Sequence, residues 1–288
     1  MDHDGTSRWL GGTSGASFLD HLKRFIHTIE GVLKGAPNSP PVGTTLLSSL
    51  GRYQTYDSRP LLWPQVQPFE LPDPGAADQM LRQVRWFIQD GSIQLSRGST
   101  SSFGQSFGQP LDDLQSPGIN YFGKFDSIEL QSYYTDLSDN GRLAQGRQRG
   151  LAFYQAAFAY ASLFSLTTVN SKQDGRLGET YFARALALIG NPLDPAIFNQ
   201  FSPDDMPALA LMALYMLEMN RRDVAYMYVA IAMHLCMMHG VHRGRVDETE
   251  KRVFWTLFCL DRWFSCLMGR PPNISDEAIL LGEPVDCE

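Results

Sequence analysis

The feature that most constrains the fold is a series of apolar segments with helical spacing between residues 143 and 268. Apolar side chains recur there every three or four residues, which places them on one face of an α-helix, and no alternating strand pattern interrupts them. Helices are predicted over residues 143–168, 177–189, 204–219, 222–239 and 248–268. Short connections favour antiparallel neighbours. The sequence therefore predicts an all-α fold, an antiparallel bundle or a stack of helix pairs.

Local signals at the ends of these segments support the same interpretation. Ser202-Pro203-Asp204 is typical of a helix start, with proline at the first helical position. Gly240 and Gly269 stand where a helix ends in a left-handed residue, and Pro271-Pro272 prevents continuation. These residues predict the boundaries of the last helices.

The first 140 residues give a weaker pattern, and we expect a long irregular N-terminal portion. Residues 1–140 are predicted to be a lead-in with helices near 18–33 and 76–90, and residues 141–288 to form the helical domain. Residues 91–118 are rich in serine, glycine and glutamine, which is typical of a loop. Residues 119–140 are ambiguous between helix and turn.

The charge balance limits the class of partner. The 288 residues contain 24 Lys and Arg against 31 Asp and Glu, a net charge of −7. A stand-alone nucleic-acid binding surface would be basic, and no basic run here is longer than two residues, so a simple basic nuclear localisation signal is missing. None of the four cysteines forms a C-x2-C pair, which favours reduced, intracellular thiols.

Residues 224–241 form the longest apolar run, which raises the question of a membrane span. The run only reaches the lower limit of spanning length, and alanine, methionine and tyrosine insert weakly. A buried core helix is the favoured interpretation, and no membrane partner is predicted.

Two short motifs match the residue pattern of catalytic signatures but lack the flanking residues or elements that those signatures need. Residues 104–108 read G-Q-S-F-G, the pattern of a hydrolase nucleophile elbow, but no strand precedes the serine and no helix follows it. Residues 118–124 have the spacing of a phosphate-binding loop, but Phe125 occupies the position of the metal-binding hydroxyl. We predict no catalytic residue, no cofactor-binding residue and no enzyme.

The sulfur and imidazole groups of residues 206–242 have competing interpretations. Cys236 and His239 share a helix face, but His234 lies about 140° around the helix from His239, and His242 follows the expected helix end. A zinc site needs three or four converging ligands, so no metal site is predicted. Eight methionines in the same two helices indicate either core packing, which is favoured, or an adaptable ligand or partner surface.

Asp261 is the most informative single position. It shares a stripe of the predicted helix 248–268 with large apolar residues, which predicts that its carboxylate is buried. A buried carboxylate must be paired or hydrogen-bonded, and Arg243, Arg262 and Arg270 are the candidate partners. A structural ion pair that fixes the helix to a loop is favoured over a catalytic acid, because no second titrating group is apparent.

An ordered series of residues between 225 and 284 resembles the middle homology region of fungal binuclear zinc-cluster transcription factors. After an Ala-rich helix come Gly240-Val241-His242-Arg243, Glu250 to Trp255, Leu260-Asp261-Arg262, Gly269-Arg270-Pro271 and Ile274-Ser275-Asp276. The resemblance is good over residues 150–286. The residues that carry the family motif, and to which we assign structural roles, are Gly240, His242, Arg243, Arg252, Trp255, Asp261, Arg262, Gly269, Arg270 and Pro271.

The chain also departs from the family pattern. Val241 replaces the usual leucine, Lys251 an arginine and Phe254 the first tryptophan. The six-cysteine zinc cluster of the family is not in these residues, so zinc would belong to that missing module, and the helical region of the family usually extends further than Glu288. We expect a truncated gene product, a fragment, or a regulator without its own DNA-binding part.

The resemblance implies a transcriptional regulator. It implies a helical regulatory domain that acts in the nucleus, or in the cytoplasm, on a metabolic or secondary-metabolite gene set. The expected partners are other transcription-regulator subunits and a small-molecule effector, with DNA reached only indirectly. The alternative is a helical interaction module without DNA binding that modulates a full-length relative.

Overall fold

The computed structural model describes residues 65–88, 125–164, 174–190, 201–244 and 246–284. The described part contains helices and no strand, which confirms the all-α prediction. Its α-helices are α3 (Pro74–Ile88), α5 (Ser127–Asn140), α6 (Gln145–Ser162), α7 (Asp174–Ile189), α8 (Met206–Glu218), α9 (Arg222–Met238) and α10 (Glu248–Met268). Three short 3-10 helices accompany them, η3 (Pro203–Asp205), η4 (Val241–Arg243) and η5 (Asp276–Ala278).

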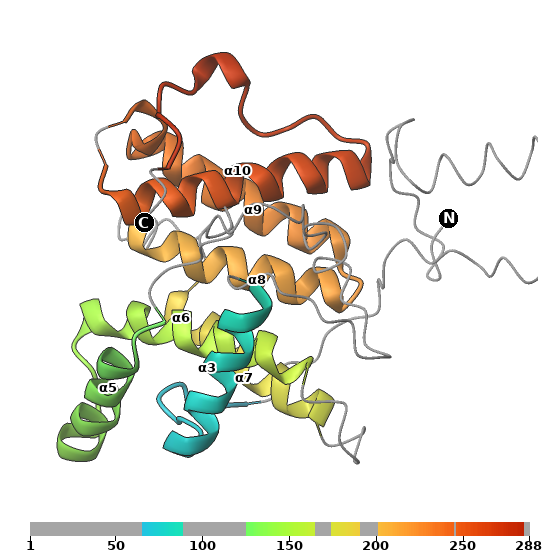
Figure 1. The fold of residues 1–288 in the computed structure, drawn as a ribbon. Helices are drawn as coiled ribbons and strands as arrows, with labels where there is room; N and C mark the ends of the chain where they lie inside the picture. Colours follow the sequence, from blue (N-terminus) through green and yellow to red (C-terminus); the bar gives the residue numbers. More distant parts are fainter. Residues whose placement is uncertain (1–64, 89–124, 165–173, 191–200, 245, 285–288) are drawn as a thin grey trace, which may run out of the picture.

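Helices α6 and α8 form the centre of the molecule because they are apolar on nearly every face. Every residue of α6 from Leu151 to Ser162 is buried, and in α8 every residue from Met206 to Leu217 except Pro207 is buried. Such all-round burial needs neighbours on several sides. Helix α6 packs against α3, α7 and α8, α8 packs against α9, and α9 packs against α10. Figure 1 shows the resulting layers, from α10 at one face through α9 and α8 to α6, α7 and α3.

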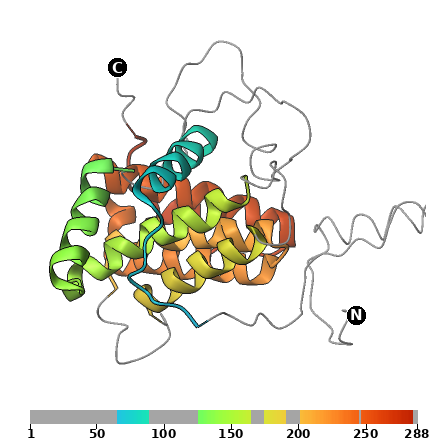
Figure 2. The ribbon, with the colours of Figure 1, turned by 90° about the horizontal axis from the view of Figure 1, so that it is seen from below.

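Helix α3 belongs to the segment assigned to the lead-in, and it packs directly on the central layer. Its buried residues Ala77, Leu81 and Val84 recur at helical spacing. The view from below in Figure 2 shows α3 and α5 at the periphery of the α6–α10 stack. Tyr134 of α5 donates a hydrogen bond from its hydroxyl to the carbonyl oxygen of Pro72 at 2.6 Å. The segment before α3 is thereby tied to α5.

The predicted helices agree with the structure, with differences at their ends. Helix α10 spans the predicted 248–268, and α9 ends one residue before the predicted end. Helix α6 ends at Ser162 rather than 168, although Leu163 and Phe164 beyond it still pack against the core. Within the ambiguous segment 119–140, residues 127–140 form α5, because Asp126 caps its first turn and Gly141 ends it at φ 64°.

The structure bears on two alternatives that the sequence left open, the role of the methionines and the membrane span. Met206, Met212, Met216 and Met233 lie in the core, whereas Met227 and Met238 are 50% and 60% exposed. The methionines are therefore divided between packing and surface. No helix of the described residues is long and apolar enough to cross a membrane. The predicted helix 18–33, the loop 91–118 and the two motifs at 104–108 and 118–124 lie outside the described residues.

Candidate functional site

The family-motif residues gather where α9, η4 and α10 meet the segment that follows α10. Gly269 ends α10 in the left-handed region at φ 62°, and its amide bonds back to the carbonyls of Cys266 and Ser265. Residues with a Cβ are strained in this conformation, so glycine is the natural choice. The turn directs residues 270–284 back along α10, as Figure 1 shows.

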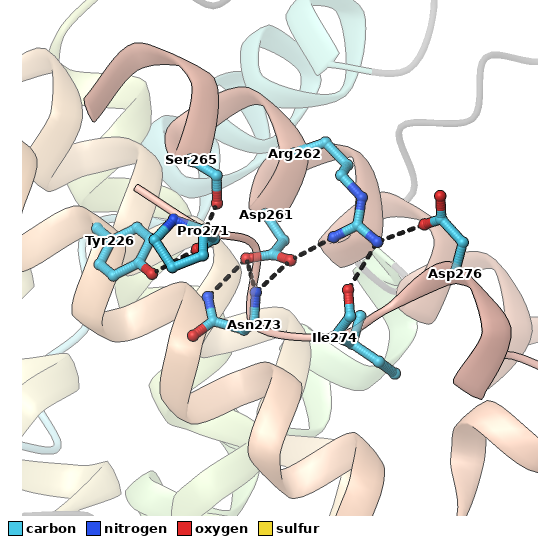
Figure 3. Close-up of polar contacts among 8 residues, drawn as sticks. All are labelled: Tyr226, Asp261, Arg262, Ser265, Pro271, Asn273, Ile274 and Asp276. Atoms are coloured by element: carbon cyan, nitrogen blue, oxygen red, sulfur yellow. Dashed lines mark hydrogen bonds and ion pairs between the residues drawn. The ribbon is translucent and has the colours of Figure 1, made fainter. Parts of the chain in front are cut away.

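Asp261 is the centre of this arrangement. Its side chain is fully buried, and its carboxylate accepts three kinds of hydrogen bond, all from nearby residues of the chain. The backbone amide of Asn273 donates at 3.0 and 3.2 Å, the Asn273 side-chain amide at 2.5 Å, and the Arg262 guanidinium at 2.8 Å (Figure 3). These donors supply the hydrogen bonds that a carboxylate buried away from water needs.

Arg262 extends the connection outward from Asp261. Its guanidinium also donates to the carbonyl oxygen of Ile274 at 2.7 Å and to the carboxylate of Asp276 at 2.6 Å (Figure 3). It lies 4.3 Å from the centre of the Phe258 ring. One arginine therefore binds the helix, the returning segment and η5 together. Of the three arginines that the sequence offers as partners of Asp261, the structure selects Arg262.

Arg270 and Pro271 attach the start of the returning segment to α9. Arg270 forms an ion pair with Asp223 at 2.6 Å, with both side chains largely buried. The carbonyl oxygen of Pro271 accepts hydrogen bonds from the Tyr226 hydroxyl at 3.0 Å and the Ser265 hydroxyl at 3.4 Å (Figure 3). The G-R-P part of the motif thus bridges α9 and α10.

Gly240 and His242 hold the far end of the same segment. Gly240 is left-handed at φ 73° and begins η4, where His242 is buried. The carbonyl oxygen of His242 accepts the amides of Leu280 and Leu281 at 2.9 and 3.0 Å. The Nδ1 atom of His242 is buried and has no hydrogen-bond partner among the described residues. Arg243 is exposed, and its Nε lies 3.4 Å from His242 Nε2.

The two remaining motif residues lie in the first two turns of α10. The Trp255 indole N–H donates to the carbonyl oxygen of Gly282 at 2.9 Å, which gives the returning segment another anchor. Arg252 pairs with Glu248 one turn earlier at 3.5 Å. Asp247 and Glu250 form a capping box that starts the helix. We use the name motif clamp for the contacts of Asp261, Arg262, His242 and Trp255 with residues 270–284, together with the ion pair between Arg270 and Asp223.

The chemistry of the motif clamp is that of attachment. Asp261 accepts hydrogen bonds from the Asn273 amides and from the Arg262 guanidinium, so its carboxylate joins α10 to the segment that follows it. The arrangement therefore acts by holding residues 270–284 against α9 and α10.

The histidine and cysteine cluster does not converge on a point. His234 Nδ1 lies 2.7 Å from the carbonyl oxygen of Ala230, and His239 Nε2 lies 3.1 Å from that of Phe201. Burial raises the pKa of the Cys236 thiol, so it remains protonated. Among the described residues no group of three or more histidine, cysteine or acidic side chains could hold a metal ion.

A second feature, which the sequence motifs do not indicate, is a cleft of about 660 Å³. We call it the N-terminal cleft, because the first turns of α5, α6, η3–α8 and α10 line it. Arg149 of α6 forms an ion pair at 2.5 Å with Asp205, whose side chain is 1% exposed. Burial raises the pKa of Asp205, while the Ser202 amide and Arg149 lower it.

An aromatic group forms another wall of the N-terminal cleft. The Tyr133 and Tyr154 hydroxyls donate to the two carboxylate oxygens of Glu129 at 3.1 and 3.0 Å. Burial, aided by Glu129, raises the pKa of Tyr133 to about 12 and raises that of Tyr154 further. Both hydroxyls are therefore neutral donors at physiological pH. Phe153 packs edge-on against Tyr154 with ring centres 5.3 Å apart.

Comparison with known proteins identifies the family of the chain. The model of the fungal specific transcription factor domain matches residues 121–288. The chain belongs to this family. All of the motif-clamp residues and the N-terminal cleft lie within the matched range. The resemblance inferred from the residue series is thereby confirmed.

The curated relatives that match this chain are named as transcriptional regulators. An uncharacterized transcriptional regulatory protein of Schizosaccharomyces pombe is 25% identical over 136 residues, 44% of this chain and 17% of its own. Activator of stress genes protein 1 of Candida albicans is 25% identical over 162 residues, 49% of this chain and 16% of its own. Thiamine repressible genes regulatory protein thi1 of Schizosaccharomyces pombe is 26% identical over 117 residues, 38% of this chain and 14% of its own.

The matched part spans about a sixth of the length of these relatives. No solved structure gives a significant match to the chain. The family and the names of the relatives are those of transcriptional regulators rather than of enzymes.

Proposed function

We propose that this chain acts as the regulatory domain of a transcriptional regulator, in the nucleus, on a metabolic or secondary-metabolite gene set. The observation that carries the proposal is the family match over residues 121–288, which covers the helical body from α5 onward. The names of two relatives, a regulator of thiamine-repressible genes and an activator of stress genes, support a role in metabolic or environmental response.

The proposed mode of action is contact with other regulator subunits. The net charge of −7 is unfavourable for direct binding to the phosphate backbone of DNA. A packed helical body whose returning segment is held by the Arg270–Asp223 ion pair and by hydrogen bonds to Asp261 and Arg262 instead provides a defined surface for a protein partner. A small-molecule effector would act by stabilising one arrangement of that surface over another.

A tethering experiment tests the proposal. The 288-residue chain is fused to a heterologous DNA-binding protein in yeast, and transcription from a reporter with the matching operator is measured. We expect the fusion to raise or lower reporter transcription relative to the DNA-binding protein alone. A fusion that is folded, nuclear and bound to the operator, yet leaves transcription unchanged, would contradict the regulatory role.

Asp261→Ala and Asp276→Ala fusions provide a matched pair for the same assay. Both substitutions remove a carboxylate that binds Arg262, but Asp261 is buried and Asp276 is 78% exposed. We expect the reporter effect to be lost with Asp261→Ala and retained with Asp276→Ala. Equal effects of both variants would mean that the motif clamp is not needed for regulation.

A further inference from the structure

Residues 66–72 cross the helical body before α3 begins, and we call them the strap. Figure 2 shows the strap running across α6 and α7. The Gln155 side-chain amide of α6 donates to the backbone carbonyl oxygen of Glu70 at 2.8 Å, and Arg184 of α7 forms an ion pair with the Glu70 carboxylate. The two apolar residues that flank Glu70 pack against the core; they are Phe69 and Leu71. The helices therefore hold a short segment by one charge, one backbone carbonyl and two apolar side chains.

The strap uses only part of the hydrogen-bonding capacity of Gln155 and Arg184. Gln155 is fully buried, and Arg184 is 7% exposed. The Oε1 atom of Gln155 and the Nε atom of Arg184 are buried and have no hydrogen-bond partner among the described residues. Buried polar atoms are normally paired, because water cannot replace a missing partner. One acceptor and one donor therefore remain unused beside the strap.

These unused atoms define the ligand that would fit better than the strap does. Nε and Nη2 of an arginine present parallel N–H groups, which hold the two oxygens of a carboxylate most strongly when both bind. Glu70 binds only Nη2 of Arg184. The Gln155 amide can likewise bind both a carbonyl and an N–H group of a peptide backbone, and Glu70 supplies only the carbonyl. A peptide that satisfies all four atoms carries an acidic residue at this position.

The strap is also the weaker partner in its own ion pair. The Glu70 side chain is 61% exposed, whereas that of Arg184 is 8% exposed. A carboxylate so open to water is easily replaced by a competing one. Gln155 and Arg184 lie within the matched family range 121–288, and the strap precedes that range. The recognition site thus belongs to the helical domain, and its present occupant comes from the sequence before it.

We propose that the face of α6 and α7 beneath the strap is a peptide-binding site. Its ligand is a non-helical segment of a partner protein in which an acidic residue stands between two apolar residues, and Phe69-Glu70-Leu71 of the strap is an internal competitor for the site. That the partner is another regulator subunit rests on the proposed function, whereas the binding itself does not.

Fluorescence anisotropy on the full chain tests the binding. The probe is a fluorescein-labelled peptide with the sequence of residues 66–73, V-Q-P-F-E-L-P-D. In the unmodified chain the strap competes at an effective concentration of roughly millimolar, so the probe should bind weakly. In Glu70→Ala the competitor has lost its carboxylate, and we expect the probe to bind about tenfold more tightly.

Matched controls are available in the chain and in the probe. Gln67→Ala truncates another exposed residue of the strap and should bind the probe as the unmodified chain does. A probe with glutamine in place of its glutamate should bind the Glu70→Ala chain about tenfold more weakly, and added salt should weaken only the acidic probe. If Glu70→Ala does not fold by circular dichroism, Glu70→Asp, which withdraws the charge by one methylene, takes its place.

Photo-cross-linking locates the bound probe. A probe with benzoylphenylalanine in place of its phenylalanine is irradiated with the Glu70→Ala chain, and the cross-linked peptides are identified by mass spectrometry. We expect the cross-links in α6 and α7. Cross-links confined to other elements would overturn the assignment of the site.

Two binding results would also overturn the inference: no binding of the acidic probe to the Glu70→Ala chain, or equal binding of the acidic and glutamine probes. The tethered reporter assay separates this failure from failure of the proposed function. Reporter regulation by the unmodified fusion without probe binding would refute the peptide site alone. Probe binding with the same reporter effect in the Glu70→Ala and unmodified fusions would refute a regulatory role of the site and leave the binding established.

Discussion

Removing the Asp261 carboxylate should destabilise the domain more than removal of any exposed carboxylate of the motif clamp. In Asp261→Ala the Asn273 amides lose their acceptor, and Arg262 keeps only Ile274 and Asp276. The donors left without an acceptor surround a position where the Asp261 side chain is 0% exposed, so water cannot fully replace the carboxylate. The substitution also leaves a space where a buried side chain stood.

The magnitude follows from the kinds of bond that are lost. A hydrogen bond to a charged group contributes about 1.5–3 kcal/mol, and Asp261 makes one with Arg262 and at least one with Asn273. Breaking a buried ion pair by removing one partner costs about 3–5 kcal/mol. We therefore expect Asp261→Ala to lower the free energy of unfolding by about 3–5 kcal/mol. For a domain of this size, a loss of 3 kcal/mol lowers Tm by about 6–12 °C.

Urea unfolding followed by circular dichroism measures this change, with Asp276→Ala as the control. Asp276 binds the same arginine but is 78% exposed, so its removal should cost about 0–1 kcal/mol. Asp261→Asn, which keeps the shape and one acceptor, should fall between the two. If Asp261→Ala and Asp276→Ala unfold at the same urea concentration, the buried carboxylate does not stabilise the fold and the reasoning is refuted.

Three further perturbations test other parts of the structure. Gly269→Ala places a Cβ on a residue at φ 62° and should cost about 1–2 kcal/mol in a thermal melt; an unchanged Tm would contradict the left-handed turn. Gly150→Ala directs a Cβ at the Tyr133 hydroxyl and should lower stability by about 1–3 kcal/mol by urea unfolding, whereas a neutral result would contradict the close packing of α5 on α6. In an alkaline titration read by tyrosinate absorbance, Tyr133 should ionise near pH 12. Because its folded pKa lies above the ordinary value of 10, its contribution to stability is complete below pH 10 and is lost as the pH rises through 12. Ionisation of Tyr133 at pH 10 without unfolding would contradict its burial.

The helices could be predicted from the sequence because their signals are local. Apolar spacing defined α8, α9 and α10 to within a few residues, and Gly240 and Gly269 marked their ends through the left-handed conformation. The prediction extended α6 too far because Leu163 and Phe164 continue its apolar pattern after the helix ends. The spacing of apolar residues follows contact with the core rather than helical structure itself. A turn that still packs on the core therefore continues the apolar pattern after the helix has ended.

The partners of Asp261 could be predicted only in part. Its burial follows from its place on an apolar stripe, and Arg262 was one of three candidate arginines. Asn273 gave no signal, because its position depends on how residues 270–284 fold back over α10. The N-terminal cleft was missed for the same reason. Glu129 and Asp247 are far apart in sequence and line the same cleft only through the packing of four helix ends.

The central claim is that the family motif fastens residues 270–284 to α9 and α10, and hydrogen exchange read by mass spectrometry tests it most directly. The amides of Asn273, Leu280 and Leu281 donate to Asp261 and His242, so peptides that contain them should exchange slowly in the unmodified chain. In Asp261→Ala the Asn273 peptide should exchange faster while α6 and α8 remain protected. Rapid exchange of residues 270–284 in the unmodified chain would contradict the claim.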